Sequence, residues 1–435
     1  MKQKVNIMWF RRDLRLHDNA ALYHALKRKL PVVAIFIFDK NILDDLEEKK
    51  DRRVEFIHQE LHEMQAELEA HKSSLSVFYD KPVHIFKQLF DEFDIDTVFA
   101  NEDFEQYAID RDNAISEICK KHNAAFMLYK DQVIFSKNEV LKDDGTPYTV
   151  FTPYSKKWKA ALNDFYLKSY PVKKYAGNFL KQTPHRIPPL EHMGFEKTDL
   201  PFPSKSFNQS LIEKYSGTRD YPGIKGTSHL GVHLRFGTIS IRELVRYAKK
   251  HSEVFLNELI WREFYQMILS QFEHVRKYHS FRKEYDHVKW RNNEKEFEAW
   301  CNGQTGYPIV DAGMRELNAT GFMHNRVRMI TASFLTKHLL IDWRWGESYF
   351  AKKLLDYDFA NNNGGWQWAA GSGCDAAPYF RVFNPALQAK KFDKDMKYIR
   401  KWVPELDELS YPQPIVEHEA ARKKALEVYA KAVKL

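Results

Sequence analysis

The chain has 435 residues, of which 44% are hydrophobic and 14% aromatic, and its formal net charge is +8. This length favours two domains over a single core. The three cysteines are widely spaced without a Cys-x-x-Cys pair, which excludes a disulfide scaffold and a structural zinc site and fits a reducing cytoplasm. No apolar run could span a membrane and no signal segment opens the chain, so we expect a cytoplasmic protein.

The positive charge has two explanations. Lysine and arginine neutralise phosphates in every nucleic-acid complex, so a basic protein fits a polyanionic partner. On charge alone, however, an ordinary basic surface is the better explanation. Charge therefore does not decide between them.

The first 130 residues alternate between two periodicities. Short β-rich or apolar runs occupy residues 5–10, 32–38, 75–79, 97–100 and 124–128. Helical patterns lie between them, the clearest over residues 54–68. Strands alternating with helices predict an α/β domain over residues 1–130, with a five-stranded, parallel, doubly wound sheet. No Gly-x-Gly-x-x-Gly follows the first strand, which argues against a dinucleotide bound there.

The character of the chain changes twice after residue 130. Residues 131–204 contain eight of the seventeen prolines and no sustained periodicity, which predicts a long inter-domain linker. From residue 205 to 435 strand signals vanish, so we expect an all-α domain. Its helical patterns cover residues 239–250, 253–273, 307–320, 326–340, 347–355 and 416–433.

Tryptophan is concentrated in this second half. Seven of the ten tryptophans fall within about a quarter of the chain: Trp261, Trp290, Trp300, Trp343, Trp345, Trp366 and Trp368. Tryptophan usually belongs to a core or an interface. Such a density in one segment indicates a buried planar ligand, stacked bases or a path for electrons.

Two pairs in this half combine a polar with an apolar side chain on one helical face. Glu258 and Trp261 are three residues apart, and Asn325 and Met329 are four apart. Each pair alone is better explained by core packing. Together, in a tryptophan-rich domain, they favour a site. The run Gly226-Thr227-Ser228 fits either a helix N-cap or a phosphate seat, and is a weak signal by itself.

The least ordinary stretch is residues 356–368, Asp-Tyr-Asp-Phe-Ala-Asn-Asn-Asn-Gly-Gly-Trp-Gln-Trp. Three asparagines and two glycines predict an irregular backbone, while the flanking aromatic residues demand burial. A buried irregular backbone needs polar partners, which a bound ligand would supply. The alternative is a surface Asn-Gly loop, which Trp366 and Trp368 make the poorer explanation.

Long motifs resemble the photolyase/cryptochrome family. Residues Trp9–Asn19 (WFRRDLRLHDN) are similar to its opening signature. Four further segments, in the family's order, match its flavin domain: residues 258–265, 305–312, 323–329 and 363–368. The resemblance runs essentially from end to end and is to class I cyclobutane pyrimidine dimer photolyases of bacterial type. Two departures are Phe322, where the family commonly has Trp, and Asn361, where it commonly has Ala.

The resemblance implies a carbon–carbon lyase that repairs cyclobutane pyrimidine dimers in DNA, by light-driven electron transfer from reduced FAD to a flipped-out dimer. It implies that Arg328 pairs with Asp356 beside the isoalloxazine, that Asp358 meets the ribose and that Asn362 faces flavin N5. Plant cryptochromes have Asp at that last position and animal ones Cys, so Asn favours the repair-active reduced flavin. The positions that match the flavin site are Tyr215, Thr227, Ser228, His229, Leu230, Gly231, Arg328, Asp356, Tyr357, Asp358 and Asn362.

The same resemblance assigns the substrate and electron-transfer residues. The residues implied to act on the dimer are Glu258, Trp261, Asn325, Met329 and Asn362, with Trp261 as the stacking platform. The residues implied to bind DNA are Arg219, Glu258, Trp261, Arg262, Asn325, Arg326, Trp368, Arg381 and Gln388. The residues that match the chain of tryptophans feeding electrons to an oxidised flavin are Trp366, Trp343 and Trp290; core packing is the alternative for them.

A second chromophore is also implied. Asn101, Glu102 and Lys277 resemble positions that hold an antenna, and 5,10-methenyltetrahydrofolate is favoured over 8-hydroxy-5-deazaflavin. Arg276 does not fit that site, so an empty site stays open. We expect a monomer that acts on ultraviolet-damaged DNA, duplex or single-stranded, without a metal or a membrane.

Three rival functions remain at this point. A blue-light signalling cryptochrome shares the fold and the flavin, but Asn362 and the Glu258/Trp261 pair count against it. A photolyase for the (6-4) lesion usually has a second histidine after Met-His, where this chain has Asn325. A non-enzymatic flavoprotein would bind damaged DNA and leave it unchanged in light.

Overall fold

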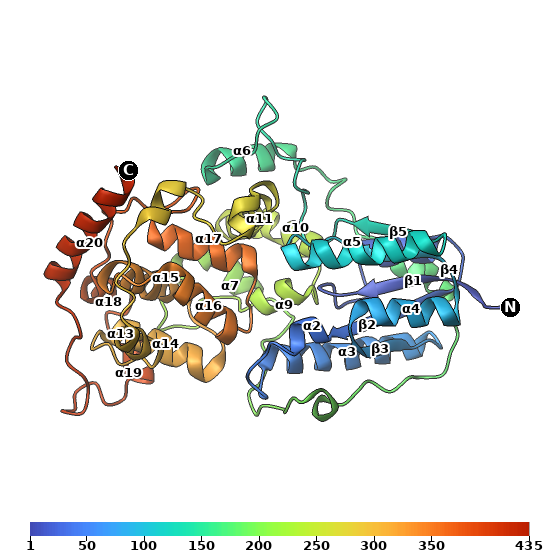
Figure 1. Ribbon diagram of the computed structural model, residues 1–435, viewed down its shortest axis with the longest axis horizontal. Helices are drawn as coiled ribbons and strands as arrows, with labels where there is room; N and C mark the ends of the chain where they lie inside the picture. Colours follow the sequence, from blue (N-terminus) through green and yellow to red (C-terminus); the bar gives the residue numbers. More distant parts are fainter. Residues whose placement is uncertain (435) are drawn as a thin grey trace. The chain divides into compact units, whose positions relative to one another are not determined.

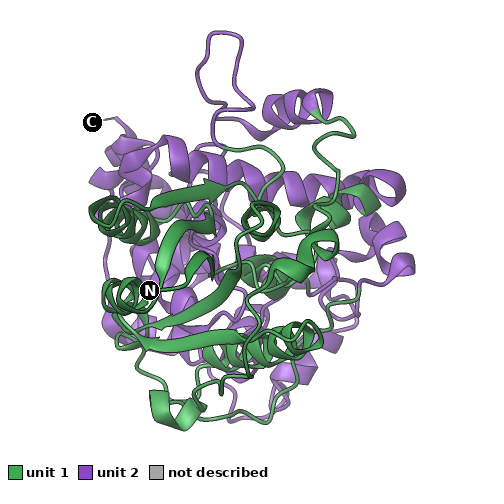
Figure 2. Cartoon of the chain, turned by 90° about the vertical axis from the view of Figure 1, so that its right-hand side faces the viewer, with its two compact units in different colours: residues 1–136, 162–206, 230–247 green, residues 137–161, 207–229, 248–435 purple. Residues whose placement is uncertain are grey.

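The computed structural model describes residues 1–434. The chain forms two compact units (Figure 2). Unit 1 contains residues 1–136, 162–206 and 230–247, and unit 2 contains residues 137–161, 207–229 and the chain from 248 onward. These boundaries differ from the three segments expected from the sequence. The stretch 131–204 is divided between the units instead of forming one linker, and residues 230–247 join unit 1.

Unit 1 is built on a parallel sheet with the strand order β3-β2-β1-β4-β5. Its strands are β1 Lys4–Phe10, β2 Val32–Asp39, β3 Leu75–Asp80, β4 Asp94–Asn101 and β5 Ala125–Tyr129. Nearly every residue of β1 and β2 is buried, as expected for central parallel strands covered on both faces. The predicted five-stranded, parallel, doubly wound sheet is confirmed.

Helices cover both faces of this sheet (Figure 1). Apolar residues of α4 and α5 share one core cluster with Ile7 and Trp9 of β1. Asn6 points to the opposite face, because side chains alternate along a strand, and its Nδ2 donates to the Ala25 carbonyl of α1 at 3.3 Å. The helices that lie in or begin in this unit are α1 Ala20–Lys27, α2 Lys40–Leu43, α3 Arg52–Ala70, α4 Pro82–Glu92, α5 Gln106–Lys121, η1 Val172–Asn178, η2 Leu190–Met193, α9 Gly231–Phe236 and α10 Ile241–His251.

Unit 2 is helical, and its described residues contain no strand. One of its core clusters joins apolar residues of α13 to α17 and α19. Between residues 1 and 434 no helix is long and apolar enough to cross a membrane. The helices are α6 Phe151–Ala161, α7 Gln209–Glu213, α8 Tyr215–Thr218, α11 Glu253–Gln271, α12 Glu273–Arg276, η3 Lys283–His287, α13 Glu294–Cys301, α14 Pro308–Thr320, α15 Asn325–Ser333, the π-helical η4 Phe334–His338, α16 Trp343–Lys353, α17 Phe359–Ala370, α18 Pro385–Phe392, α19 Lys397–Trp402 and α20 His418–Val433.

One prediction about backbone conformation is wrong. Residues 356–368 do not form an irregular loop, because α17 runs from Phe359 to Ala370. The helix begins at a strong cap: the Asp358 carboxylate accepts from the Asn361 backbone N–H at 3.1 Å and from its Nδ2 at 2.6 Å. The asparagine that would favour a turn is therefore held in the first helical turn by its own side chain.

Close packing explains the first glycine of α17. A methyl group on Gly364 would overlap the ring of Tyr265 from α11, so only glycine lets the two helices approach this closely. Gly365 has no such neighbour within 4 Å. Tertiary contacts, which local propensity does not report, therefore keep this glycine-rich and asparagine-rich segment helical.

Candidate functional site

A cavity of about 440 Å³ lies in unit 2, within the range of ligand-binding pockets. Most of its wall comes from α8, α11, α15, α16 and α17 and from the segment that precedes α17. The lining residues are Tyr215, Arg219, Asp220, Thr227, Glu258, Trp261, Arg262, Tyr265, Asn325, Arg326, Arg328, Met329, Ala332, Phe350, Leu354, Asp356, Tyr357, Asp358, Asn361, Asn362, Gly365, Trp366 and Trp368.

Most of the residues singled out in the sequence line this one cavity. All five that the resemblance assigns to the dimer do so, namely Glu258, Trp261, Asn325, Met329 and Asn362. Of the flavin positions, Tyr215, Thr227, Arg328, Asp356, Tyr357, Asp358 and Asn362 line it, whereas Ser228, His229, Leu230 and Gly231 do not. Of the other DNA positions, Arg219, Arg262, Arg326 and Trp368 line it, whereas Arg381 and Gln388 do not.

Three arginines of the wall are paired with carboxylates. Arg219 binds Glu258, so two residues with separate expected roles are bonded to each other. Arg326 donates to an oxygen of Asp220 at 2.6 Å. The third pair joins Arg328 to Asp356, with the shorter Nη2–Oδ2 distance at 2.9 Å. The pairing of Arg328 with Asp356 is the one that the resemblance implies.

Glu258 has an unusual protonation equilibrium. Burial raises the pKa of its carboxyl above the ordinary value, and the positive charge of Arg219 opposes the rise without cancelling it. The carboxyl group is therefore easier to protonate than a glutamate in water. In its protonated form it can donate a hydrogen bond to a carbonyl oxygen of a ligand.

The helix that carries Asn325 and Met329 is held at its first turn by His324. Nδ1 of this buried histidine accepts from the backbone N–H of Arg326 at 3.1 Å, which requires a neutral ring. Burial and the nearby charge of Arg328 lower the pKa of His324 to about 4, so the ring is neutral at physiological pH. The cap thereby fixes where Asn325 enters the cavity.

Asn362 is oriented by a residue that sequence reasoning missed. Its Nδ2 donates to Oε1 of Glu347 at 2.9 Å and to the Glu347 backbone carbonyl at 3.1 Å. Glu347 lies on α16 and is only 1% exposed. Because the amide nitrogen is engaged, the Oδ1 of Asn362 is the atom that remains for a ligand, and it accepts hydrogen bonds. A glutamate fifteen residues away on another helix gives no local sequence signal of this role.

The predicted tryptophan chain begins at the cavity wall. Trp366 lines the cavity and is almost fully buried. Its ring lies against Gly346, which is one turn along α16 from the buried Trp343. Trp343 and Trp366 belong to one core cluster, and Trp290 packs against that cluster. The three indoles are thus part of a single aromatic region.

The antenna positions lie in different units. The polar atoms of the Asn101 side chain are used inside unit 1: Nδ2 donates to Asp13 at 2.6 Å and to Asn19 at 2.9 Å, and Oδ1 accepts from the Ala21 N–H at 3.0 Å. The Ser136 hydroxyl of the same unit lies 3.4 Å from the Glu102 carboxylate. In unit 2, Lys277 pairs with a glutamate one turn earlier at 2.7 Å. Asn101 therefore offers a ligand no unused side-chain group.

Several lining residues escaped sequence reasoning. They are Asp220, Tyr265, Ala332, Phe350, Leu354 and Gly365. Tyr265 and Asp220 stand next to motif residues and could have been found by extending the helical face of Trp261 and the turn of Arg219. The apolar members carry no chemical signal that separates them from core residues.

Comparison with known proteins agrees with this geometry. Residues 6–174 match the family model described as DNA photolyase, and residues 255–410 match the FAD binding domain of DNA photolyase. The deoxyribodipyrimidine photo-lyase of Escherichia coli K12 is 37% identical, over 99% of this chain and 99% of that protein.

Two solved structures are similar over nearly their full lengths. A bacterial class III photolyase from Agrobacterium tumefaciens has a TM-score of 0.87 and 32% identity, covering 100% of this chain and 99% of that one. An archaeal photolyase from Sulfolobus tokodaii, solved with two FAD molecules, has a TM-score of 0.83 and 34% identity, covering 99% and 100%. The chain therefore belongs to the DNA photolyase family.

Proposed function

We propose that this chain is a deoxyribodipyrimidine photo-lyase, which uses light to split cyclobutane pyrimidine dimers in DNA. The observation that carries the proposal is one cavity of unit 2, whose wall contains most of the residues expected to hold FAD and all five expected to act on the dimer. Reduced FAD, when bound, would supply the light-excited electron. The full-length relative from E. coli bears the name of this enzyme.

The orientation of Asn362 supports a reduced flavin. Glu347 engages the amide nitrogen, so Asn362 turns a hydrogen-bond acceptor, Oδ1, towards whatever lies next to it in the cavity. N5 of a reduced flavin carries a hydrogen and can donate, whereas N5 of an oxidised flavin can only accept. An acceptor held at this position stabilises the protonated N5 and disfavours the oxidised form.

The remaining wall residues fit a flipped-out dimer. Trp261 offers an aromatic surface, and stacking of a base on such a ring is worth roughly 1–3 kcal/mol. Glu258 and Asn325 bring hydrogen-bonding groups, and Met329 adds a deformable apolar contact. Extrusion of the lesion costs a few kcal/mol, least where damage already weakens pairing and stacking. The cavity therefore supplies interactions on the scale of the cost.

Phosphates would compete with carboxylates for the arginines at the cavity. Arg219 and Arg326 each bind a neighbouring carboxylate, so DNA binding would exchange or share these partners. Arg262 lines the same cavity, and Arg381 and Gln388 lie outside its wall. These five residues are proposed to contact the DNA backbone. Their contribution should weaken as salt rises.

The rival functions are less well supported. A signalling cryptochrome would not need Glu258, Trp261 and Asn325 in the same cavity as Asn362, whose Oδ1 would accept a hydrogen bond from the flavin. A (6-4) photolyase is disfavoured because Asn325 follows His324 where that enzyme usually has a second histidine. A purely binding flavoprotein shares all of these contacts, and only the fate of the dimer in light separates it from an enzyme.

A monomer in the cytoplasm belongs to the same proposal. DNA as the substrate agrees with a cytoplasmic protein, in which the three buried, unpaired cysteines would stay reduced. Gel filtration of the FAD-loaded protein at several concentrations tests the oligomeric state. A dimer at every concentration would contradict the expected monomer.

Three chromophores are candidates for the antenna, one more than the resemblance implied. A folate held by Asn101, Glu102 and Lys277 would have to displace the internal hydrogen bonds of Asn101. A deazaflavin is the other candidate from the sequence. The Sulfolobus tokodaii photolyase contains two FAD molecules, so a second flavin becomes a third candidate. Chromatography of the pigments released by denaturation, with FAD counted per protein chain, distinguishes all three, and one FAD per chain without another pigment would count against an antenna.

The decisive experiment measures dimer splitting. The purified protein is loaded with FAD, reduced with dithionite and mixed with an oligonucleotide that contains one thymine dimer. We expect the thymine absorbance to return under blue light and not in the dark. Damaged DNA that is bound but unchanged after illumination would contradict the proposal and favour the binding flavoprotein.

The tryptophan chain has a separate test. Trp366→Phe should abolish photoreduction of the oxidised protein, because the indole next to the cavity is the expected first donor. Repair by chemically pre-reduced protein should remain close to wild type. Equal loss of both activities would show that Trp366 serves packing alone.

A further inference from the structure

The short helix α6 packs on the helix that carries the substrate residues (Figure 1). It lies in the stretch that the sequence analysis interpreted as a linker, yet it belongs to the same compact unit as the cavity. Phe151, Tyr154 and Trp158 are spaced by three and four residues, so they share one face of α6. Each of the three contacts a residue of α11.

The closest of these contacts is made by Phe151. Its ring stacks on the indole of Trp261 with a centroid distance of 3.7 Å and an interplanar angle of 5°. The other rings around Trp261 lie differently, since Phe264 meets it edge-on at 82° and Tyr265 is tilted by 33°. Phe151 is therefore the ring that covers a face of the indole. No base could stack on that face while Phe151 is there.

With one face of the indole covered by Phe151, a base can stack only on the other face. Trp261 lines the cavity and Phe151 does not. A base that enters the cavity therefore meets the indole on the side that Phe151 leaves uncovered. Phe151 and Trp261 already form a stack of two rings, to which a base in the cavity would add a third.

Other contacts hold Phe151 in this place. Its backbone N–H donates to the Asp375 carboxylate at 3.1 Å. One turn along α6, Tyr154 packs on Phe264 with the centroids 5.1 Å apart. Further on, Nε1 of Trp158 donates to the buried Glu263 at 2.5 Å. These contacts fix the backbone from which the Phe151 ring projects onto Trp261.

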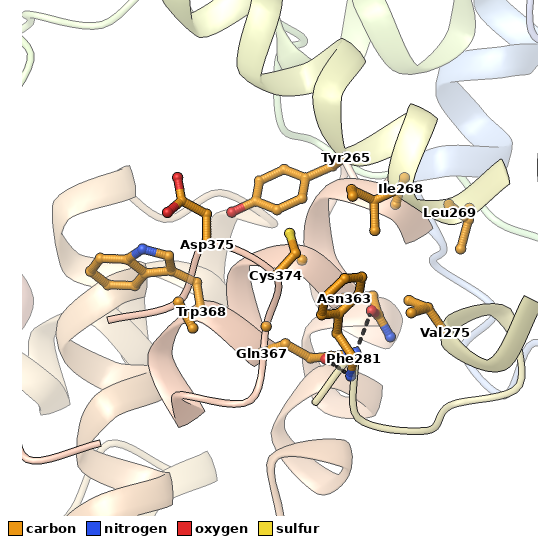
Figure 3. A pocket seen from close by; sticks show the side chains of 14 residues that line it. Tyr265, Ile268, Leu269, Val275, Phe281, Asn363, Gln367, Trp368, Cys374 and Asp375 are labelled. Atoms are coloured by element: carbon orange, nitrogen blue, oxygen red, sulfur yellow. Dashed lines mark hydrogen bonds between the residues drawn. The ribbon is translucent and has the colours of Figure 1, made fainter. Parts of the chain in front are cut away.

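The anchor of Phe151 also belongs to the surroundings of the substrate site. Asp375 lines a small pocket of about 20 Å³ together with Tyr265 and Trp368, and Figure 3 shows these three side chains. Tyr265 and Trp368 line the large cavity as well. Asp375, which binds the backbone of Phe151, thus lines the same small pocket as Trp368, a second tryptophan expected to bind DNA.

We propose that Phe151 is a positioning residue for lesion recognition: it holds the Trp261 ring in the orientation that stacks on a flipped-out pyrimidine. The proposal rests on the proposed function. A ring that is fixed in advance loses less freedom on binding, so the support raises the affinity for the lesion. A phenyl ring has no charge with which to bind phosphates, so affinity for undamaged DNA should not depend on Phe151.

The test compares two affinities measured in the dark at one salt concentration. Phe151→Ala should weaken binding of a dimer-containing duplex about ten-fold and leave binding of the undamaged duplex unchanged. Phe151→Tyr keeps the ring and should behave like wild type. Phe151→Leu keeps the bulk but not the flat ring and should fall between them, and it replaces the alanine variant if that fails to fold. Phe165→Ala removes the same ring at a site that is 72% exposed and should change neither affinity.

A double-mutant cycle separates positioning from general damage to the fold. In a Trp261→Ala background, Phe151→Ala should cause no further loss of preference for the dimer. An equal loss in both backgrounds would overturn the proposal, as would unchanged preference in the single variant. The near-ultraviolet circular dichroism of the indole should also change in Phe151→Ala and not in Phe165→Ala.

These readouts do not depend on repair. Wild-type protein that prefers damaged DNA but splits no dimers would contradict the proposed function, and the result for Phe151 would still stand. Wild-type protein without any preference for the dimer would overturn the positioning role as well.

Discussion

In unit 1 the Asp131 carboxylate lies at the centre of a closed set of ion pairs. It receives Arg15 at 2.7 Å and Arg242 at 2.8 Å, and Arg242 also binds Asp18 at 2.9 Å. All four side chains are at most 6% exposed. Burial alone would raise the pKa of Asp131, but the two arginines outweigh it and hold that pKa below its ordinary value.

The charges of unit 2 are arranged differently. Arg219 and Glu258 form one pair at the cavity, and each side chain is 34% exposed. Asp220, which binds Arg326, is 36% exposed. Such pairs are only partly removed from water and have few partners, so a ligand can exchange with them. Buried charges that pair with one another stabilise unit 1, whereas partly exposed pairs line the candidate site in unit 2.

The largest change in the free energy of unfolding should come from breaking the ion pairs around Asp131. Arg242→Met leaves two buried carboxylates short of a partner, and removal of one partner of a buried ion pair typically costs about 3–5 kcal/mol. Urea unfolding measures the loss. The matched change at the cavity, Arg326→Met, should cost about 1 kcal/mol or less, because partly exposed pairs contribute little. Equal losses would remove the distinction between the two units.

A second effect concerns the cap of α15 beside the cavity. His324 has a pKa of about 4 in the folded chain, below the ordinary 6.5, so between these values the unfolded chain binds the proton that the folded chain does not. Stability should therefore fall as the pH drops from 6.5 to 4, by about 3 kcal/mol from this group alone. His324→Asn keeps an N-cap acceptor without a titratable ring. If its unfolding free energy falls with pH as steeply as that of wild type, His324 is not responsible.

The third effect tests the packing of α17 on α11. Gly364→Ala would force a methyl group into the Tyr265 ring, and overpacking of this kind costs about 1–3 kcal/mol. Gly365→Ala meets nothing within 4 Å and should be neutral or stabilise the helix by up to about 1 kcal/mol. Chemical unfolding of the FAD-free protein compares the two variants. A stable Gly364→Ala protein would show that α11 and α17 can move apart.

The sequence predicted those parts of the fold that local patterns decide. The central strands of unit 1 are continuous apolar runs, and the pattern over residues 253–273 gave α11 almost to its ends. The sequence did not predict α6, because the eight prolines of residues 131–204 and the lack of periodicity there indicated a linker. Pro153 lies in the first turn of that helix, where proline is tolerated.

Most of the expected site residues line one cavity, but the residues that support them were not expected from the sequence. Glu258 and Asn325 lie in motifs that resemble a known family, and Asn362 lies next to one, so their positions could be carried over. Glu347 and Phe151 act on Asn362 and Trp261 from other helices, and Phe151 is 110 residues away from its partner. Contacts between residues this far apart in the sequence produce no periodic pattern from which they could be predicted.

The smallest expected effect concerns the protonation of Glu258. Burial raises the pKa of this carboxyl above 4.5, with Arg219 opposing the rise, so the protonated fraction grows as the pH falls through the raised pKa. A protonated Glu258 can donate to a carbonyl oxygen of the dimer, and this bond strengthens as negative charge develops on the dimer. The yield of repair per absorbed photon should therefore rise a few-fold as the pH is lowered, as long as the protein stays folded.

Two variants separate this protonation from other roles of Glu258. Glu258→Gln carries a permanent donor, so its yield should be high and independent of pH. Glu258→Ala has none, so its yield should be low at every pH while dark binding of the damaged duplex changes less. The yield is measured with pre-reduced protein saturated with DNA, so that binding and chemistry are counted separately. A glutamine profile that follows wild type would assign the pH dependence to another group, and a collapse of binding in the alanine variant would make Glu258 a residue that positions DNA. Because each side chain of the Arg219–Glu258 pair is 34% exposed, a ligand that enters the cavity can reach this carboxyl group and change its protonation.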